Sequence, residues 1–178
     1  LKKLHRWIML STTYQQASSV PREQFDQDPD NRRLARFTAR RLEAEAIRDA
    51  MLYVAGRLDR SSGGPAGDDL NILPRSLYVQ TSRWDRSNFA TLFDAANPDA
   101  STEKRNVSTV ASQSLFLLNN SFVLTQAGRL AKRLVQQTPN DEGARIQQAF
   151  QLLFNRSASV EETQFALQLL AESRQYGT

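Results

Sequence analysis

In the C-terminal third of the chain, apolar side chains recur every three to four residues, which is the period of an amphipathic α-helix. The pattern predicts one helix over residues 112–137, closed by Pro139, and another over residues 144–154. Ser159 followed by Glu162 has the spacing of a capping box, so a last helix is expected to begin there. The short connection before it predicts that the last two helices pack antiparallel.

The same period continues toward the N-terminus. It predicts helices over residues 1–16, 31–58 and 87–96. Residues 76–81 alternate in character and are the best strand candidate, with residues 70–73 as a possible partner. The expected fold is therefore all-α, an irregular domain of about five to six helices with long loops, with room for one short β-hairpin near residues 70–82.

Length and composition bound the function. The chain has 178 residues, a net charge of +4, one histidine and no cysteine. One domain over residues 1–178 is expected, and no apolar run approaches the roughly 20 residues of a membrane span. Without cysteine, the chain cannot supply a disulfide, a thiolate zinc site or a covalent haem attachment, so no cofactor is expected in it. Because the first residues already have helical spacing, we interpret the sequence as a C-terminal piece of a larger protein, with part of the domain missing before it.

In the first half of the helix predicted over residues 31–58, five arginines lie on one or two adjacent helical rows: Arg32, Arg33, Arg36, Arg40 and Arg41. If that helix forms, Arg33, Arg36 and Arg40 present a basic row that could bind an anion such as phosphate. The alternative is a solvated face whose arginines pair with nearby acids. Because no aromatic side chains interleave with the row as base stacking requires, nucleic acid is not the expected partner.

The same predicted helix carries carboxylates that could act as an acid/base pair, and Glu45 and Asp49 are the weak catalytic candidates. The alternative is a structural ion-pair network of Arg41, Glu45, Arg48 and Asp49, because helical spacing allows each acid an arginine partner. The network is favoured. It predicts that loss of either Arg48 or Glu45 destabilises the fold.

Three further features have ordinary explanations. Residues 63–67 are rich in glycine but lack the Lys-Ser/Thr of a phosphate-binding loop, so a turn is expected. His5 has no second imidazole or thiol with which to bind a metal, and no metal site is expected. Trp7, Trp84 and Phe89 are expected to be core or interface anchors rather than a ligand groove.

Four stretches in one order resemble a known family: residues 1–16, residues 40–52, residues 56–60 with 63–65, and residues 106–123. The chain resembles the planctomycete-specific uncharacterised domain found at the C-terminal end of large cytochrome-c-like proteins. The family's motif positions correspond here to Arg41, Glu43, Glu45, Arg48, Asp49, Arg57, Asp59, Ser108, Thr109, Gln113, Asn119, Phe122 and Val123. The sequence departs from the family at Ser112, where Pro or Thr is expected.

The resemblance implies an extracytoplasmic bacterial protein and assigns no reaction and no residue roles. Any haem would belong to other regions of the parent protein. We therefore expect a non-catalytic structural or interaction module whose partners are other domains of the same polypeptide. The alternatives are part of an enzyme acting on carbohydrate or another polymer and, last, an anion-binding face.

Overall fold

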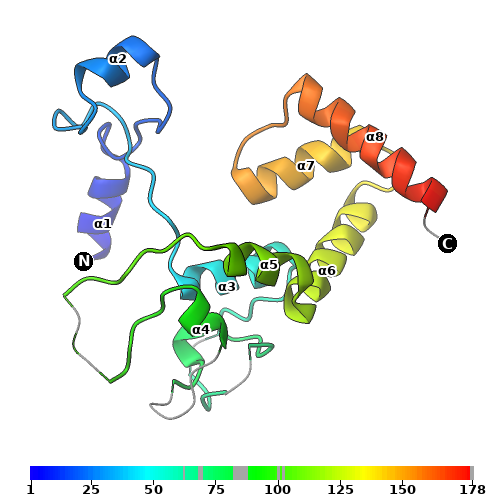
Figure 1. The fold of residues 1–178 in the computed structure, drawn as a ribbon, viewed down its shortest axis with the longest axis horizontal. Helices are drawn as coiled ribbons and strands as arrows, with labels where there is room; N and C mark the ends of the chain where they lie inside the picture. The colour runs from blue at the N-terminus through cyan, green and yellow to red at the C-terminus, as the bar shows by residue number, and fades with distance from the viewer. Residues whose placement is uncertain (62, 68–69, 82–87, 100, 102, 177–178) are drawn as a thin grey trace. The chain divides into compact units, whose positions relative to one another are not determined.

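The computed structural model describes residues 1–61, 63–67, 70–81, 88–99, 101 and 103–176. These residues form eight α-helices, a single 3-10 turn and two isolated bridges, with no β-strand among them (Figure 1). The all-α expectation is confirmed. The chain divides into two compact units, residues 1–41 and residues 42–178, and each is described by itself.

The first unit holds two short helices, α1 (Lys2–Met9) and α2 (Arg22–Gln27). α1 is shorter than the helix predicted over residues 1–16. After it the chain turns, and the hydroxyl of Ser11 donates to the carbonyl oxygen of Ile8 at 2.7 Å. This side-chain bond offers the backbone an alternative to a further helical turn.

Residues 31–43 are not helical, so the prediction of one helix over residues 31–58 is wrong in its first half. The carboxylate of Asp28 accepts the backbone N–H groups of Arg32 and Arg33, both at 2.8 Å. Asn31 has a positive φ of 52°, and its side-chain amide donates to the carbonyl oxygen of Arg36. These local bonds compete with helix formation, so the arginines do not form a row on one helix face.

The second unit is built on α3 (Ala44–Val54), which contacts the 3-10 turn η1 (Ser76–Tyr78), α4 (Asn88–Leu92) and α6 (Ser121–Gln137). α3 ends at Val54 with Ala55 as its C-cap, and Gly56, whose φ of +70° suits glycine, then reverses the chain. The N–H groups of Gly56 and Arg57 then bond to carbonyl oxygens of the last turn.

The short hairpin expected near residues 70–82 does not form in the described part of that segment. Residues 76–78 make the turn η1, and the two bridges join Asp59 to Pro74 and Gly67 to Val79. Gly67 is required at its bridge because a Cβ there would lie 2.6 Å from a side-chain carbon of Ile72.

Three phenylalanines form the apolar core beside α3. Phe89 and Phe93 belong to the α4 region and Phe116 to α5 (Ala111–Asn119), with ring centroids 4.7–5.7 Å apart. Ala44 is buried with the first two rings, and Ile47 packs against the cluster. The prediction that Phe89 is a core residue is confirmed, but Phe89 also lines the pocket beside α3, which the prediction did not expect. This cluster fixes α4 and α5 on the N-terminal turns of α3.

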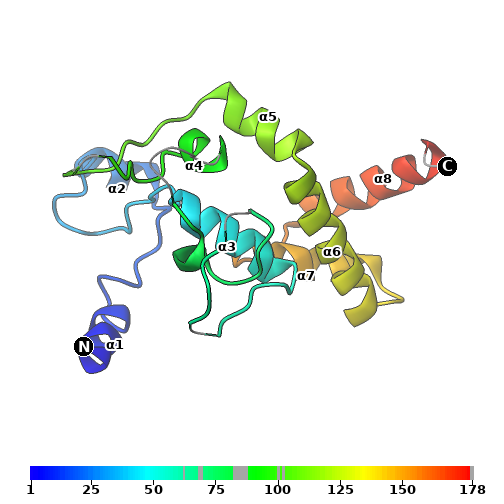
Figure 2. The same ribbon diagram turned by 90° about the horizontal axis from the view of Figure 1, so that it is seen from below.

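The helix predicted over residues 112–137 is two helices, α5 and α6, which change direction where they meet (Figure 2). Asn120 lies between them in an extended conformation, with ψ 131°. Its side chain accepts the N–H of Phe122 at 2.9 Å and so caps α6.

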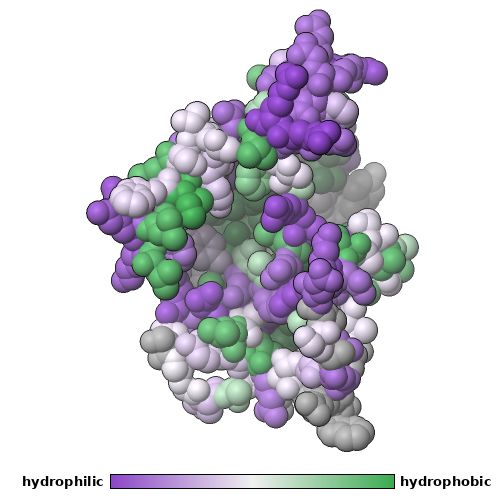
Figure 3. Space-filling view, turned by 90° about the vertical axis from the view of Figure 1, so that its left-hand side faces the viewer, coloured by the Kyte–Doolittle hydropathy of each residue, from purple (hydrophilic) through white to green (hydrophobic). Residues whose placement is uncertain are grey.

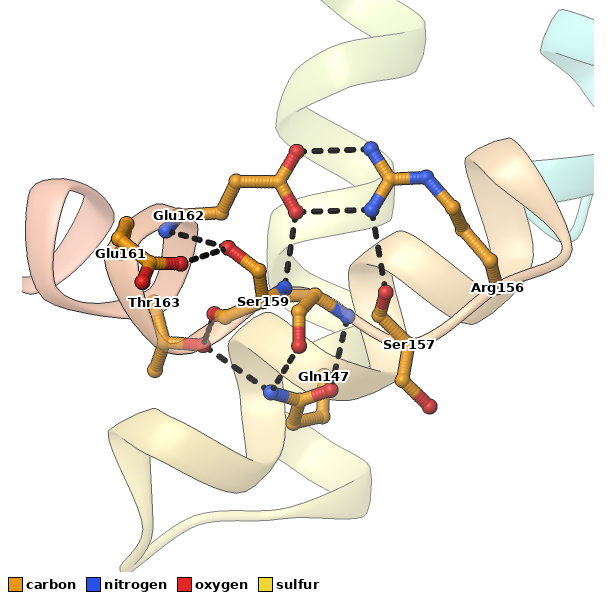
Figure 4. Close-up of polar contacts among 8 residues, drawn as sticks. Gln147, Arg156, Ser157, Ser159, Glu161, Glu162 and Thr163 are labelled. Atoms are coloured by element: carbon orange, nitrogen blue, oxygen red, sulfur yellow. Dashed lines mark hydrogen bonds and ion pairs between the residues drawn. The ribbon is translucent and has the colours of Figure 1, made fainter. Parts of the chain in front are cut away.

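The last two helices, α7 (Glu142–Phe154) and α8 (Val160–Tyr176), pack side by side and run antiparallel, as predicted (Figure 1). The capping box is also confirmed (Figure 4). The backbone N–H of Ser159 donates to Glu162 at 2.8 Å, and the N–H of Glu162 donates to the Ser159 hydroxyl at 3.2 Å. The guanidinium of Arg156 donates two hydrogen bonds of 2.7 Å to the carboxylate of Glu162. They attach the loop between α7 and α8 to the first turn of α8.

Candidate functional site

A pocket of about 480 Å³ lies within the second unit. Its walls come from α3, α4, residues 70–81, residues 94–98 and residues 104–106. The polar side chains that line it include Glu45, Arg48, Gln80, Thr81, Asp94, Lys104, Arg105 and Asn106. A pocket of this size fits a small molecule, so the polar groups around it are the candidate site.

Arg48 is the most buried charged residue of the site, with 2% of its side chain exposed. Its Nε donates to the carbonyl oxygen of Leu70 at 2.9 Å, and Nη1 donates to that of Pro74 at 3.1 Å. Nη2 donates to the carbonyl oxygen of Ile72. The guanidinium therefore gathers three backbone carbonyls of one loop, and its role is structural.

Asp49 holds the end of the same loop. Its Oδ1 accepts the backbone N–H of Ser76 at 2.8 Å and the Ser76 hydroxyl at 2.7 Å. The same oxygen lies 3.3 Å from Nη1 of Arg48, and Oδ2 lies 3.9 Å from Nε of Arg75. Asp49 does not line this pocket, and its hydrogen bonds to Ser76 and Arg48 are all accepted by Oδ1.

Glu45, at the start of α3, faces the pocket and is paired with Arg105. Nη1 of Arg105 lies 2.7 Å from Oε2 of Glu45 and 3.3 Å from Oε2 of Glu43. Partial burial, the largest single influence, raises the pKa of Glu45. The hydrogen bond and the charge of Arg105, together with a backbone hydrogen bond, outweigh it and hold that pKa below its usual value. The side-chain hydrogen bond to Glu45 likewise raises the pKa of Arg105. Glu45 is thus an ionised carboxylate, unsuited to act as a general acid.

A second polar cluster closes the pocket on the side of α4. Asp94 lines the pocket and accepts both the N–H and the hydroxyl of Ser108 at 2.7 Å. The side-chain amide of Gln113 donates to the carbonyl oxygen of Leu92 at 2.7 Å and to the Ser108 hydroxyl at 3.3 Å. These bonds join the end of α4 to the start of α5.

The predicted network of Arg41, Glu45, Arg48 and Asp49 is rearranged in the structure. Arg41 precedes α3, so the helical spacing that paired it with Glu45 does not apply. Arg48 pairs with Asp49, its neighbour in sequence, and Glu45 pairs with Arg105. The acids are held by arginines as expected, but the partners come largely from elsewhere in the chain.

The remaining motif positions lie outside the pocket. Asp59 is exposed, and its carboxylate accepts the N–H of Ser61, which lowers the pKa of Asp59. The side-chain amide of Asn119 donates to the carbonyl oxygen of Leu115 within α5. Phe122 is buried at the start of α6. The other motif positions are Arg57 and Val123, which are half-buried, and Thr109, which is exposed.

Of the three arginines in the proposed anion-binding row, Arg36 is already engaged. Its guanidinium donates to the carbonyl oxygens of Asp28 and Pro29 and stacks over the ring of Phe25 at 4.5 Å. Arg33 and Arg40 remain exposed. Trp7 is exposed on α1, and Trp84 lies outside the described residues.

Three residues of the site escaped the sequence reasoning: Ser76, Asp94 and Arg105. Arg105 lies in a polar connection with no periodicity, so no sequence pattern linked it to Glu45, 60 positions away. Asp94 has a positive φ of 57° at the end of α4, a position that favours Asp or Asn, and this was a usable signal.

The fold and the site define an all-α domain whose charged residues chiefly fasten loops to a central helix. The described part of the chain contains no cluster of metal-binding side chains. None of its helices is both long and apolar enough to span a membrane.

The chain belongs to the PSD1 family, described as a protein of unknown function (DUF1553), whose sequence model matches residues 1–170. The resemblance to an uncharacterised domain family is thereby confirmed. Comparisons with curated proteins and with solved structures found no match.

Proposed function

We propose that the chain is a non-catalytic structural and protein-interaction module. The observation that carries this proposal is that the acid/base candidates are engaged: Glu45 by Arg105, and Asp49 by Ser76 and Arg48. A general base needs a carboxylate that can reach its substrate and change protonation state. Here both groups hold loops on α3 instead.

The surface offered for interaction is the apolar side of α1. Leu4, Trp7 and Ile8 have the i, i+3, i+4 spacing of one helix face, and each is about half or more exposed, from 47% to 62%. Lys2 and Arg6 lie on the opposite side of the helix. Elsewhere too, apolar side chains reach the surface in patches beside hydrophilic ones (Figure 3). Clustered exposed apolar side chains mark binding surfaces.

The partner we propose for this face is another domain of the same polypeptide. The test compares Leu4→Asn and Ile8→Asn with the control variants Thr12→Asn and Thr13→Asn, all in the full-length protein. We expect slow hydrogen exchange of α1 in the parent protein, faster exchange in the two apolar variants and no change in the controls. Exchange of α1 in the parent protein as fast as in an unprotected helix would overturn the proposal.

We also propose that the module stands at the C-terminal end of a larger extracytoplasmic protein of the planctomycete cytochrome-associated type, with any haem carried elsewhere. The motif resemblance supports this, as does the absence of cysteine from the chain. The test is fractionation of the native cells with an antibody to the chain, followed by haem staining of the full-length band. Recovery with the cytoplasmic fraction would contradict the extracytoplasmic location. A full-length band without haem would contradict the association with a cytochrome.

One observation favours the alternative of an enzyme part acting on carbohydrate or another polymer: the pocket contains Glu45. A turnover screen of the full-length protein against polysaccharides, with Glu45→Gln and Asp49→Asn beside it, tests this alternative. Activity lost in Glu45→Gln at unchanged melting temperature would favour the enzyme over the module.

A further inference from the structure

We propose that the pocket beside α3 is a binding site for a small hydroxylated organic anion, held by Arg105 and Lys104. This inference is independent of the proposed interaction surface on α1.

Arg105 has donors to spare. A guanidinium carries five N–H groups in a planar fork, and one edge of the fork can bind both oxygens of a carboxylate. The hydrogen bond to Glu45 uses Nη1 alone. Nε and Nη2 donate to no acceptor among the described residues, and the side chain, which lines the pocket, is 33% exposed. The edge formed by these two nitrogens is therefore available to a ligand.

Lys104 adds a second cation at the same wall. It lines the pocket, is exposed, and has no ion-pair partner in the described part of the chain. By contrast, the anions that line the pocket are engaged, Glu45 by Arg105 and Asp94 by Ser108. Among the described residues that line the pocket, Lys104 thus has a positive charge without a counter-ion, and Arg105 keeps unused N–H donors beside its ion pair. Both features favour an anionic ligand.

The rest of the wall indicates the body of the ligand. Gln80, Thr81 and Asn106 line the pocket, and their side chains form no hydrogen bond with the described residues. Amide and hydroxyl groups both donate and accept, which suits a ligand with several hydroxyl groups. A volume of about 480 Å³ admits a molecule of this kind.

Glu43 provides a way to distinguish an anionic ligand from a neutral one. It is 64% exposed and lies 3.3 Å from Nη1 of Arg105, so its charge opposes an incoming anion without being buried. Removing that charge should strengthen anion binding, whereas it should leave a neutral ligand unaffected.

The experiment is calorimetric titration of the chain with gluconate, inorganic phosphate and sorbitol. Gluconate and sorbitol are both six-carbon polyols, and only gluconate carries a carboxylate. We expect saturable binding of gluconate and none of sorbitol. Binding of phosphate tighter than gluconate would show an anion site without the proposed preference for a hydroxylated body and would overturn that part of the proposal.

The variants separate the roles of the residues. Arg105→Gln should weaken gluconate binding about 10- to 100-fold, and Lys104→Gln about fivefold. Glu43→Gln should strengthen it about threefold. Arg129→Gln and Lys132→Gln, exposed on α6, are the matched controls and should not alter it. If Arg105→Gln does not fold, the opposite effects of Lys104→Gln and Glu43→Gln still decide the question.

No binding of either anion, equal binding of sorbitol, or affinities unchanged in Lys104→Gln and Glu43→Gln would overturn the proposal.

Discussion

Asp49 and Ser76, 27 positions apart in sequence, are joined twice: the backbone N–H and the hydroxyl of Ser76 both donate to the same carboxylate oxygen, at 2.8 and 2.7 Å. The hydroxyl also lies 3.2 Å from the carbonyl oxygen of Glu45. The turn η1 is thereby attached to the middle of α3 by the contact between Ser76 and Asp49.

Ser76→Ala should weaken this attachment without abolishing it, because the backbone N–H of residue 76 still reaches Asp49. Loss of one partly buried hydroxyl bond is expected to lower the free energy of unfolding by about 1 kcal/mol. Denaturant unfolding followed by circular dichroism measures the change. Ser114→Ala, on the exposed side of α5, is the control, and an equal loss there would contradict the role given to Ser76.

Arg48→Ala should be much more damaging than Glu45→Ala, in contrast to the equal effects expected from sequence. Arg48 is 2% exposed and satisfies three carbonyl oxygens, so its removal should cost about 3–5 kcal/mol. The side chains of Glu45 and Arg105 are 41% and 33% exposed, so that pair should contribute below about 1 kcal/mol. Thermal unfolding of both variants beside Arg60→Ala, an exposed control, tests the order.

The connection between α7 and α8 should lose stability in acid. The hydrogen bonds from Arg156 lower the pKa of Glu162 from 4.5 to about 2. Because the folded pKa is below the unfolded value, the stabilisation is complete above about pH 4.5 and is lost as the pH falls toward 2. Glu162→Gln should therefore melt about 2 °C below the parent chain at pH 7, with the difference disappearing near pH 2. A melting difference independent of pH would contradict this assignment.

Nucleic acid should bind weakly. Because Arg36 is engaged by Asp28, Pro29 and Phe25, two exposed arginines of the row remain. We expect a Kd no tighter than about micromolar for a DNA oligonucleotide at physiological salt, which is the range of non-specific binding. Fluorescence anisotropy over a salt series measures it. Nanomolar affinity with a steep salt dependence would contradict this prediction and favour Arg33, Arg36 and Arg40 as a nucleic-acid-binding surface.

The helices near the C-terminus could be predicted from sequence because their determinants are local. The capping box of Ser159 and Glu162 and the apolar period of α7 and α8 act within a few residues. The break at Asn120 was missed because apolar periodicity continues across it, while the cap depends on one side chain turning back to Phe122.

The segment before α3 shows the opposite case. Leu34 and Phe37 continue the helical period, but Asp28 and Asn31 bond to the backbone of the following residues and prevent the helix. Apolar periodicity alone cannot weigh this competition. A short polar cluster such as Asp-Pro-Asp-Asn was the available warning.

The hairpin expected near residues 70–82 is absent from the described part of that segment because of contacts with a residue distant in sequence. A strand in that segment would need its carbonyl oxygens for pairing, but those of Leu70, Ile72 and Pro74 are taken by Arg48. Because Arg48 lies more than 20 positions earlier in the chain, no window of sequence contains both the donor and the acceptors. The same separation explains why the candidate site was predicted only in its α3 half.

The ring of carbonyl oxygens around Arg48 resembles the way a loop wraps a hard cation such as calcium, with oxygen atoms converging on one positive charge. Here the cation is tethered to α3 by a covalent bond. It cannot be removed by a chelator or exchanged for another ion, and it carries its charge at every physiological pH. The closure of this loop therefore follows the folding of α3, which carries the positive charge into place.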